Sequence, residues 1–189
     1  MSATKIMMAG RTDVHSMPSA PTPPDTSAAN IAVDIAVPDP RCPTAAQLAQ
    51  WAVSARAAVN ANGPMSIRIV SRRESQTLNA QYRHKDAPTN VLSFPADQSL
   101  PWPDALLAEI GAPPLGDIAI CTEVVQHEAA EQGKPVIAHF AHMVVHGVLH
   151  LLGHDHISNA DAERMEALEI DILQQLGYAN PYHLKDAEE

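Results

Sequence analysis

Histidines are concentrated in one short stretch of this 189-residue chain, because six of its ten histidines fall between positions 139 and 156. His146 and His150 are four residues apart. On a helix their imidazoles would project from one side about 6 Å apart, close enough to share a metal ion. Gly153, in a left-handed conformation, could then reverse the chain, and three further residues suffice to bring a side chain back over the helix end. This pattern predicts His156 as the third ligand.

Three neutral imidazoles with an open fourth position are typical of a catalytic zinc site. An ion in such a site lowers the pKa of a bound water to about 7. We therefore expect one Zn²⁺ per chain, although three imidazoles also accept nickel or copper. His154 is the alternative third ligand, disfavoured because the chain has barely turned at that point. Asp155 is expected to accept a hydrogen bond from a ligand imidazole or to cap the following turn. His139 and His142 are interpreted as hydrogen-bonded histidines of a buried helix.

The same histidine spacing occurs in metzincin proteases, where a glutamate directly after the first histidine is the general base. Gly147 occupies that position here. Peptide hydrolysis would lack the group that deprotonates water and protonates the leaving amine. A protease is therefore the less favoured interpretation. A phosphodiester demands less, because a metal hydroxide or the RNA 2′-OH can attack and the enzyme chiefly needs cations for the charge on phosphorus.

The distribution of charge bears on a nucleic-acid substrate. The chain has 22 acidic and 12 basic residues and a formal net charge of −10, which disfavours indiscriminate coating of RNA. Arg83 and Lys85 are nevertheless expected in a loop between a helix and a strand, where they are free to reach a substrate. Arg72 and Arg73 are explained equally well as a solvated helix face. Five cations cluster locally, at Arg68, Arg72, Arg73, Arg83 and Lys85. The acids gather near the C-terminus, at Asp155, Asp161, Glu163, Glu166, Glu169 and Asp171, so RNA should approach from the other side.

Hydrophobic periodicity predicts the elements that must position these residues. The helix over 135–152 is apolar all round and should be central and buried. The predicted fold class is α+β, a single domain in which this helix lies among other helices packed on a small mixed sheet of about four strands. Residues 97–114 are expected to form a long exposed loop. The predicted strands are 31–37, 65–70, 91–94 and 116–121, and the other helices are 44–61, 71–81, 122–132 and 158–176.

Composition also predicts the organisation of the chain. Residues 1–29 hold four of the sixteen prolines and few large aliphatic side chains, so we expect a disordered leader. Residues 30–182 are the predicted metal-dependent enzyme domain, and 183–189 a tail. Cys42 and Cys121 have no metal-site or disulfide spacing, which fits a reducing cytoplasm. No segment is apolar for long enough to predict a membrane span or a signal peptide.

Two strings of this sequence resemble signatures of the YbeY family. HGVLHLLGHDH at 146–156 matches the pattern HGxLHLxGxDH, and YRHKDAPTNVLSFP at 82–95 matches YRxKDxPTxVLSFP. GDIAIC, EQGKP, HMVV and LGYANPY are also similar to that family, and the resemblance covers residues 31–182. His84 departs from it, because the family usually has glycine there.

The resemblance implies a zinc-dependent, single-strand-specific endoribonuclease that acts in rRNA maturation, at the 3′ end of small-subunit rRNA, and in ribosome quality control. It implies that His146, His150 and His156 hold the zinc and that Arg83 is the functional arginine that meets RNA phosphate. Arg83 is therefore the expected catalytic residue, and the two loop cations Arg83 and Lys85 are the expected RNA-binding residues. Its implied partners are precursor small-subunit rRNA, ribosomal small-subunit proteins and an assembly GTPase in the cytoplasm. The alternative is a ribosome-binding assembly factor whose zinc is structural.

Overall fold

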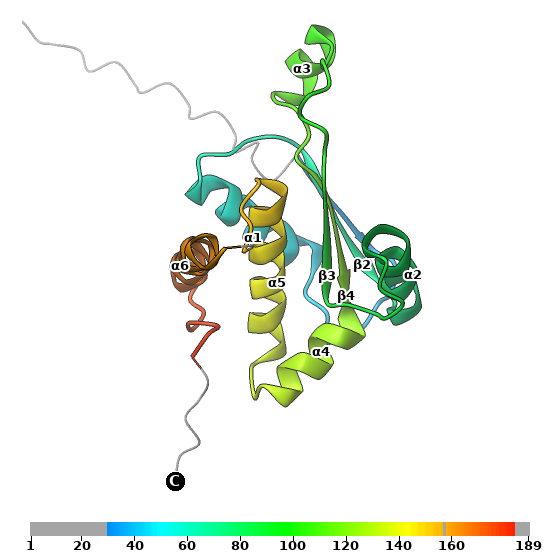
Figure 1. Ribbon diagram of the computed structural model, residues 1–189, viewed down its shortest axis with the longest axis vertical. Coiled ribbons are helices and arrows are strands. Elements are labelled where there is room, and N and C mark those ends of the chain that lie inside the picture. The colour runs from blue at the N-terminus through cyan, green and yellow to red at the C-terminus, as the bar shows by residue number, and fades with distance from the viewer. Residues whose placement is uncertain (1–29, 157, 184–189) are drawn as a thin grey trace, which may run out of the picture.

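A four-stranded mixed sheet lies at the centre of the fold (Figure 1). Its strands follow the order β1 (Ile31–Ile35), β2 (Met65–Val70), β4 (Gly116–Cys121) and β3 (Val91–Pro95). The first three are parallel, and β3 pairs antiparallel with β4 at the edge. The single α+β domain with a small mixed sheet is thus confirmed.

The computed structural model describes residues 30–156 and 158–183. The predicted leader, 1–29, lies outside the described residues, as does the predicted tail beyond His183. Within the described ranges no helix is both long enough and apolar enough to cross a membrane. Cys42 and Cys121 are free thiols.

Helices cover both faces of the sheet (Figure 1). On one face α5 (Val136–Leu151) lies between the sheet and α6 (Asn159–Gln175), with α1 (Ala45–Ala58) packed beside it. On the other face α2 (Arg72–Arg83) packs over β4, and α4 (Thr122–Glu131) leads from β4 to α5. The main core lies between the sheet and α1, α5 and α6, and a smaller one lies under α2.

The central position of α5 follows from its apolar sequence. Val144, Val148 and Leu149 are fully buried, so the predicted buried helix is confirmed. Gly147 allows α5 to approach the sheet closely, since a Cβ there would lie 3.0 Å from Cδ1 of Ile118. Ser93 on β3 also donates a hydrogen bond to the Gly147 carbonyl at 3.0 Å. Helix α5 is therefore fixed against β3 and β4 directly beside His146.

The prediction of a long exposed loop over 97–114 is wrong in that this segment contains a helix, α3 (Asp104–Ile110). The helix begins directly after Pro103 and ends at Gly111, which has a φ of 81°. Proline suits a helix start and glycine a left-handed helix end, so both ends have a local cause. None of the residues of α3 is buried, and the segment projects away from the rest of the fold (Figure 1).

Candidate metal centre and substrate cleft

Helix α5 places His146 and His150 on one side, one turn apart. Their Nε2 atoms face each other at 3.1 Å. Two nitrogens that share a tetrahedral zinc are separated by about 3.3 Å, given zinc–nitrogen distances of about 2.05 Å. The observed separation therefore fits a pair of nitrogen ligands to one ion.

A glycine-dependent helix end brings the third histidine to this pair. Gly153 has a φ of 82°, and the chain reversal is closed by backbone hydrogen bonds from Gly153 to His150 and from His154 to Leu149. His156 then lies with its ring centroid 5.1 Å from that of His150. One ring nitrogen from each of His146, His150 and His156 lies within 4.8 Å of the others.

His154 borders the same cleft but does not belong to this group of three. The structure therefore assembles the three residues that the spacing singled out. Their binding of a metal stays a prediction.

Burial affects the protonation of one candidate ligand, His150. It is the largest cause that lowers the pKa of His150, and the nearby His146 and His156 lower it further. A lowered pKa favours the neutral imidazole, which is the form that binds a metal. The site is thus suited to accept a cation near neutral pH.

A buried carboxylate on α6, Glu169, supports the histidine cluster from behind. It accepts hydrogen bonds from His146 Nδ1 at 2.7 Å and from His142 Nε2 at 3.0 Å, and also from the Tyr182 hydroxyl. Burial is the largest single influence and would raise the pKa of Glu169. The hydrogen bonds from His142 and His146, the charge of His142 and the hydrogen bond from Tyr182 together outweigh burial and lower the pKa to about 2. Glu169 is therefore ionised at neutral pH.

Sequence reasoning missed the role of Glu169 because it grouped this residue with the acids of the C-terminal helix. The side chain is fully buried, so that grouping is wrong for Glu169. A signal was present in the helical spacing, because Met165, Ile172 and Leu173 mark the buried face of α6 and Glu169 falls on that face.

Asp155 contacts the backbone of the third candidate ligand, which is neither of the two roles expected for it. Its Oδ1 atom accepts a hydrogen bond from the backbone N–H of the next residue, His156, at 2.7 Å, and the following helix is capped by Ser158 instead. The carboxylate that accepts from an imidazole of the cluster is Glu169 instead. His139 and His142 are buried and bonded to Glu128 and Glu169, as interpreted from sequence.

Arg83 is not in a loop as predicted, because it is the last residue of α2. His84 follows as the C-cap with a φ of 59°. This left-handed position ordinarily favours glycine, which explains why glycine is usual there in the resembled pattern. The Arg83 guanidinium donates a hydrogen bond to the Ser93 carbonyl at 3.0 Å. Arg83 thus reaches around the edge strand β3 toward the histidines.

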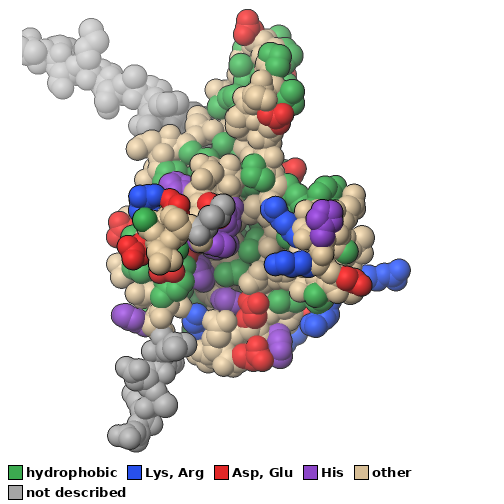
Figure 2. Space-filling model, in the orientation of Figure 1, with side chains coloured by type: hydrophobic (Ala, Val, Ile, Leu, Met, Phe, Trp, Pro, Cys, Tyr) green, Lys and Arg blue, Asp and Glu red, His purple; other side chains and the backbone are tan. Residues whose placement is uncertain are grey.

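A cleft of about 630 Å³ joins the basic residues to the histidine cluster. Arg83 and Lys85 border it on one side, and His146, His150 and His156 on the other. Figure 2 shows the histidines in a hollow, with cations on the side of α2 and acids gathered on the side of α6. The lining also includes polar side chains from the α2–β3 region and one carboxylate near His156, namely Asn79, Thr89, Asn90, Ser93 and Asp155.

The remaining cations of the predicted patch lie elsewhere. Arg68 is paired with Asp34 at 2.5 Å and with Glu74 at 3.0 Å. Arg72 and Arg73 are exposed on α2 and do not border the cleft. Of the five clustered cations, Arg83 and Lys85 are therefore the two placed to meet a substrate beside the histidines.

Comparisons with known proteins agree with this architecture. Residues 33–177 match the family described as Endoribonuclease YbeY. The solution structure of TM1509 from Thermotoga maritima is similar, with a TM-score of 0.51 and 21% sequence identity, and the match covers 84% of this chain and 99% of that chain. At this identity the likeness to TM1509 supports the fold.

Proposed function

This chain belongs to the endoribonuclease YbeY family, and from that premise we propose that it is a zinc-dependent, single-strand-specific endoribonuclease. One observation carries the proposal: three histidines with their ring nitrogens within 4.8 Å of one another share a cleft with Arg83. Its substrate would be precursor small-subunit rRNA near the 3′ end, with a further role in ribosome quality control. Residues 30–182 would form the endoribonuclease domain.

In this proposal His146, His150 and His156 hold one zinc ion. The donor set fits, because three imidazoles leave a coordination position open, as catalytic zinc sites do. When bound, zinc supplies Lewis-acid chemistry, since it polarises a phosphoryl oxygen and lowers the pKa of water. Among the described residues the chain's own contribution is to hold the three imidazoles, shape the cleft and present cations.

Arg83 is the proposed catalytic residue because its guanidinium can stabilise the negative charge that develops on the phosphate during cleavage. Its hydrogen bond to the Ser93 carbonyl leaves other N–H groups of the guanidinium for a phosphate. Lys85 would bind the RNA backbone next to it. Both cations border the cleft opposite the acids of α6, which leaves a path for a polyanion.

The metzincin-like protease stays disfavoured for a physical reason. A side chain at Gly147 would meet Ile118 and Ser93, so the position used by the metzincin glutamate points at the sheet and has no room for a carboxylate. The other alternative, an assembly factor with structural zinc, rests on the missing general base and on the modest size of the cationic patch. Whether the protein is an endoribonuclease or an assembly factor, its expected partners are ribosomal small-subunit proteins and an assembly GTPase, in the cytoplasm.

Cleavage of a single-stranded RNA oligonucleotide tests the proposal, with zinc content measured by mass spectrometry on the same preparations. His150→Ala should lose both zinc and cleavage. Arg83→Ala should retain about one zinc per chain while cleavage falls by about 100-fold or more. Arg73→Ala is the matched control, because it removes an arginine from the same helix outside the cleft, and it should retain most of the activity.

Each alternative predicts a different result. If zinc is structural and the protein an assembly factor, His150→Ala would unfold the chain and Arg83→Ala would still support ribosome assembly in cells. Equal losses in Arg73→Ala and Arg83→Ala would show that general charge, not the position of Arg83, matters. Undiminished RNA cleavage by His150→Ala would refute the proposed metal dependence.

A further inference from the structure

Glu169 is a fully buried carboxylate with three hydrogen-bond donors. An ionised carboxylate away from water is costly unless it is paired and hydrogen-bonded. Two donors, His142 and His146, come from α5, and the third, Tyr182, comes from the segment after α6. Glu169 therefore joins the central helix to the C-terminal end of the described chain.

The bond between Glu169 and His146 determines which nitrogen of His146 carries its proton. Because Nδ1 lies 2.7 Å from the carboxylate, the neutral ring keeps its hydrogen on Nδ1 and its lone pair on Nε2. Nε2 is the atom that faces His150 at 3.1 Å. The carboxylate thus turns the lone pair of His146 toward the other two candidate ligands.

His142 has a different role from His146, although the two are one turn apart on α5. Its Nε2 lies 3.0 Å from Glu169, and the ring is buried. This contact holds the second carboxylate oxygen, so that the carboxylate cannot swing away from His146. The three histidines at successive turns of α5 therefore have different roles. His142 anchors Glu169, whereas His146 and His150 point at the metal centre.

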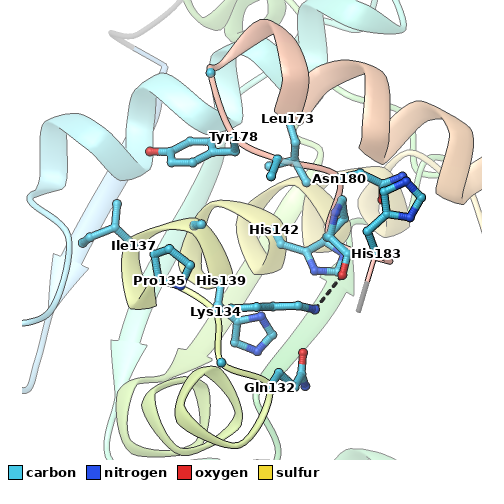
Figure 3. A pocket seen from close by; sticks show the side chains of 15 residues that line it. Gln132, Lys134, Pro135, Ile137, His139, His142, Leu173, Tyr178, Asn180 and His183 are labelled. Atoms are coloured by element: carbon cyan, nitrogen blue, oxygen red, sulfur yellow. Dashed lines mark hydrogen bonds between the residues drawn. The ribbon is translucent and has the colours of Figure 1, made fainter. Parts of the chain in front are cut away.

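The segment that follows α6 is itself held in place. Lys134 donates a hydrogen bond from Nζ to the Pro181 carbonyl at 2.6 Å, beside His142 and a cavity of about 460 Å³ (Figure 3). Tyr178 packs edge-on against Trp51 with ring centroids 6.0 Å apart. These contacts position Tyr182, whose hydroxyl donates to Glu169.

We propose that Glu169 is a positioning residue for the metal centre, which fixes the orientation and tautomer of His146, and that Tyr182 assists by holding the carboxylate. The inference rests on the proposed function, in which His146, His150 and His156 hold zinc. Carboxylates that accept from a ligand histidine typically change metal affinity by about 10- to 100-fold. Glu169 acts through His146 and does not contact the substrate.

A competing arrangement uses the same atoms. His142, His146 and Glu169 also lie close enough together to hold an ion themselves. In that case Glu169 would be a ligand, and a chain with both sites filled would carry two ions. We favour the hydrogen-bonded arrangement because a neutral imidazole has one lone pair. If Nε2 of His146 turns that lone pair toward His150, Nδ1 carries the hydrogen and can only donate to Glu169.

The test starts from the zinc-loaded full-length chain and measures zinc affinity by competition with a chromogenic chelator. Glu169→Gln should bind one zinc per chain with affinity reduced about 10- to 100-fold. Tyr182→Phe keeps the ring and removes one donor, so it should weaken zinc binding by a smaller factor. Glu163→Gln is the matched control, because Glu163 is exposed on the same helix. The zinc affinity of this variant should equal that of the wild type.

A second readout separates positioning from general stability. In the zinc-loaded wild type the Nδ1 proton of His146 should give a downfield NMR signal that exchanges slowly, and that signal should shift upfield or disappear in Glu169→Gln. Unchanged affinity and an unchanged signal in a folded Glu169→Gln protein would overturn the inference. Two zinc ions per wild-type chain, one of them lost in Glu169→Gln, would also overturn it.

The same variants separate a failure of the role assigned to Glu169 from a failure of the proposed function. If Glu169→Gln does not fold, Tyr182→Phe decides, since weaker zinc binding supports the inference and unchanged binding refutes it. If His150→Ala retains zinc, the proposed function fails first. If His150→Ala loses zinc while Glu169→Gln and Tyr182→Phe keep wild-type affinity, only the role assigned to Glu169 fails.

Discussion

Gly147 offers a quantitative test of how the site is positioned. A Cβ at this residue would lie 3.0 and 3.1 Å from two carbons of Ile118 and 3.3 Å from Ser93 Oγ. Carbon atoms prefer separations of about 3.5–4.0 Å. Because Ile118 is almost completely buried, it has little room to withdraw. Gly147→Ala should therefore push α5 away from β4 by about half an ångström.

Two opposing contributions determine the change in stability. Alanine in place of glycine inside a helix stabilises by about 1 kcal/mol, whereas overpacking a tight core costs about 1–3 kcal/mol. Displacement of α5 also stretches the hydrogen bond from Ser93 to the Gly147 carbonyl, and such a bond contributes about 1 kcal/mol. We expect Gly147→Ala to lower the free energy of unfolding by about 1–2 kcal/mol, in spite of the better helix former.

Urea unfolding followed by circular dichroism measures this change. Ala167→Gly, at an exposed position of α6, supplies the helix-propensity difference in this chain as a control, with an expected loss of about 1 kcal/mol. If Gly147→Ala were instead more stable than wild type by the amount that Ala167→Gly loses, the tight contact with Ile118 would be absent and the reasoning refuted.

Because the pKa of Glu169 is lowered from 4.5 to about 2, the ionised carboxylate stabilises the fold above about pH 4.5, and this stabilisation is lost as the pH falls toward 2. Acid unfolding should show that the difference in stability between wild type and Glu169→Gln narrows over that pH window. A constant difference would contradict the prediction. Thr44→Ala removes the side-chain cap on the Gln47 backbone and should lower the free energy of unfolding by about 1 kcal/mol, as measured in urea; no change would mean that the cap is dispensable. Asn79→Ala removes the hydrogen bond to the Ala87 carbonyl and loosens the segment after α2. RNA cleavage should therefore slow while the zinc content, measured by mass spectrometry, stays the same. Simultaneous loss of zinc would contradict a role for Asn79 that is confined to the substrate side of the cleft.

The histidine cluster could be predicted from sequence because its geometry is local. A four-residue helical spacing and a glycine at a helix end fix the relative places of His146, His150 and His156 within eleven residues. The strands and the central helix were equally predictable, since their hydrophobic periodicity reflects burial on known faces. The start of α1 at Thr44 followed from a capping box that the structure contains.

Other features depend on contacts between distant segments or on short elements. Glu169 meets His146 across 23 residues of sequence, and its charge resembles that of the exposed acids around it. Helix α2 includes Arg83 and ends where His84 adopts a left-handed conformation. A glycine at this position would have indicated the helix end from sequence, whereas a histidine does not. Helix α3 has only seven residues in a proline-rich stretch, too few for a clear periodic pattern.

In the proposed function, His146, His150 and His156 together hold one metal ion in the RNA cleft. Anomalous diffraction at the zinc edge, on crystals of the zinc-loaded full-length chain, tests it most directly. We expect one anomalous peak, bonded to a ring nitrogen of each of these three histidines, on the side facing Arg83. A peak between His142 and Glu169, a peak bonded to His154 in place of His156, or no peak at all would contradict it.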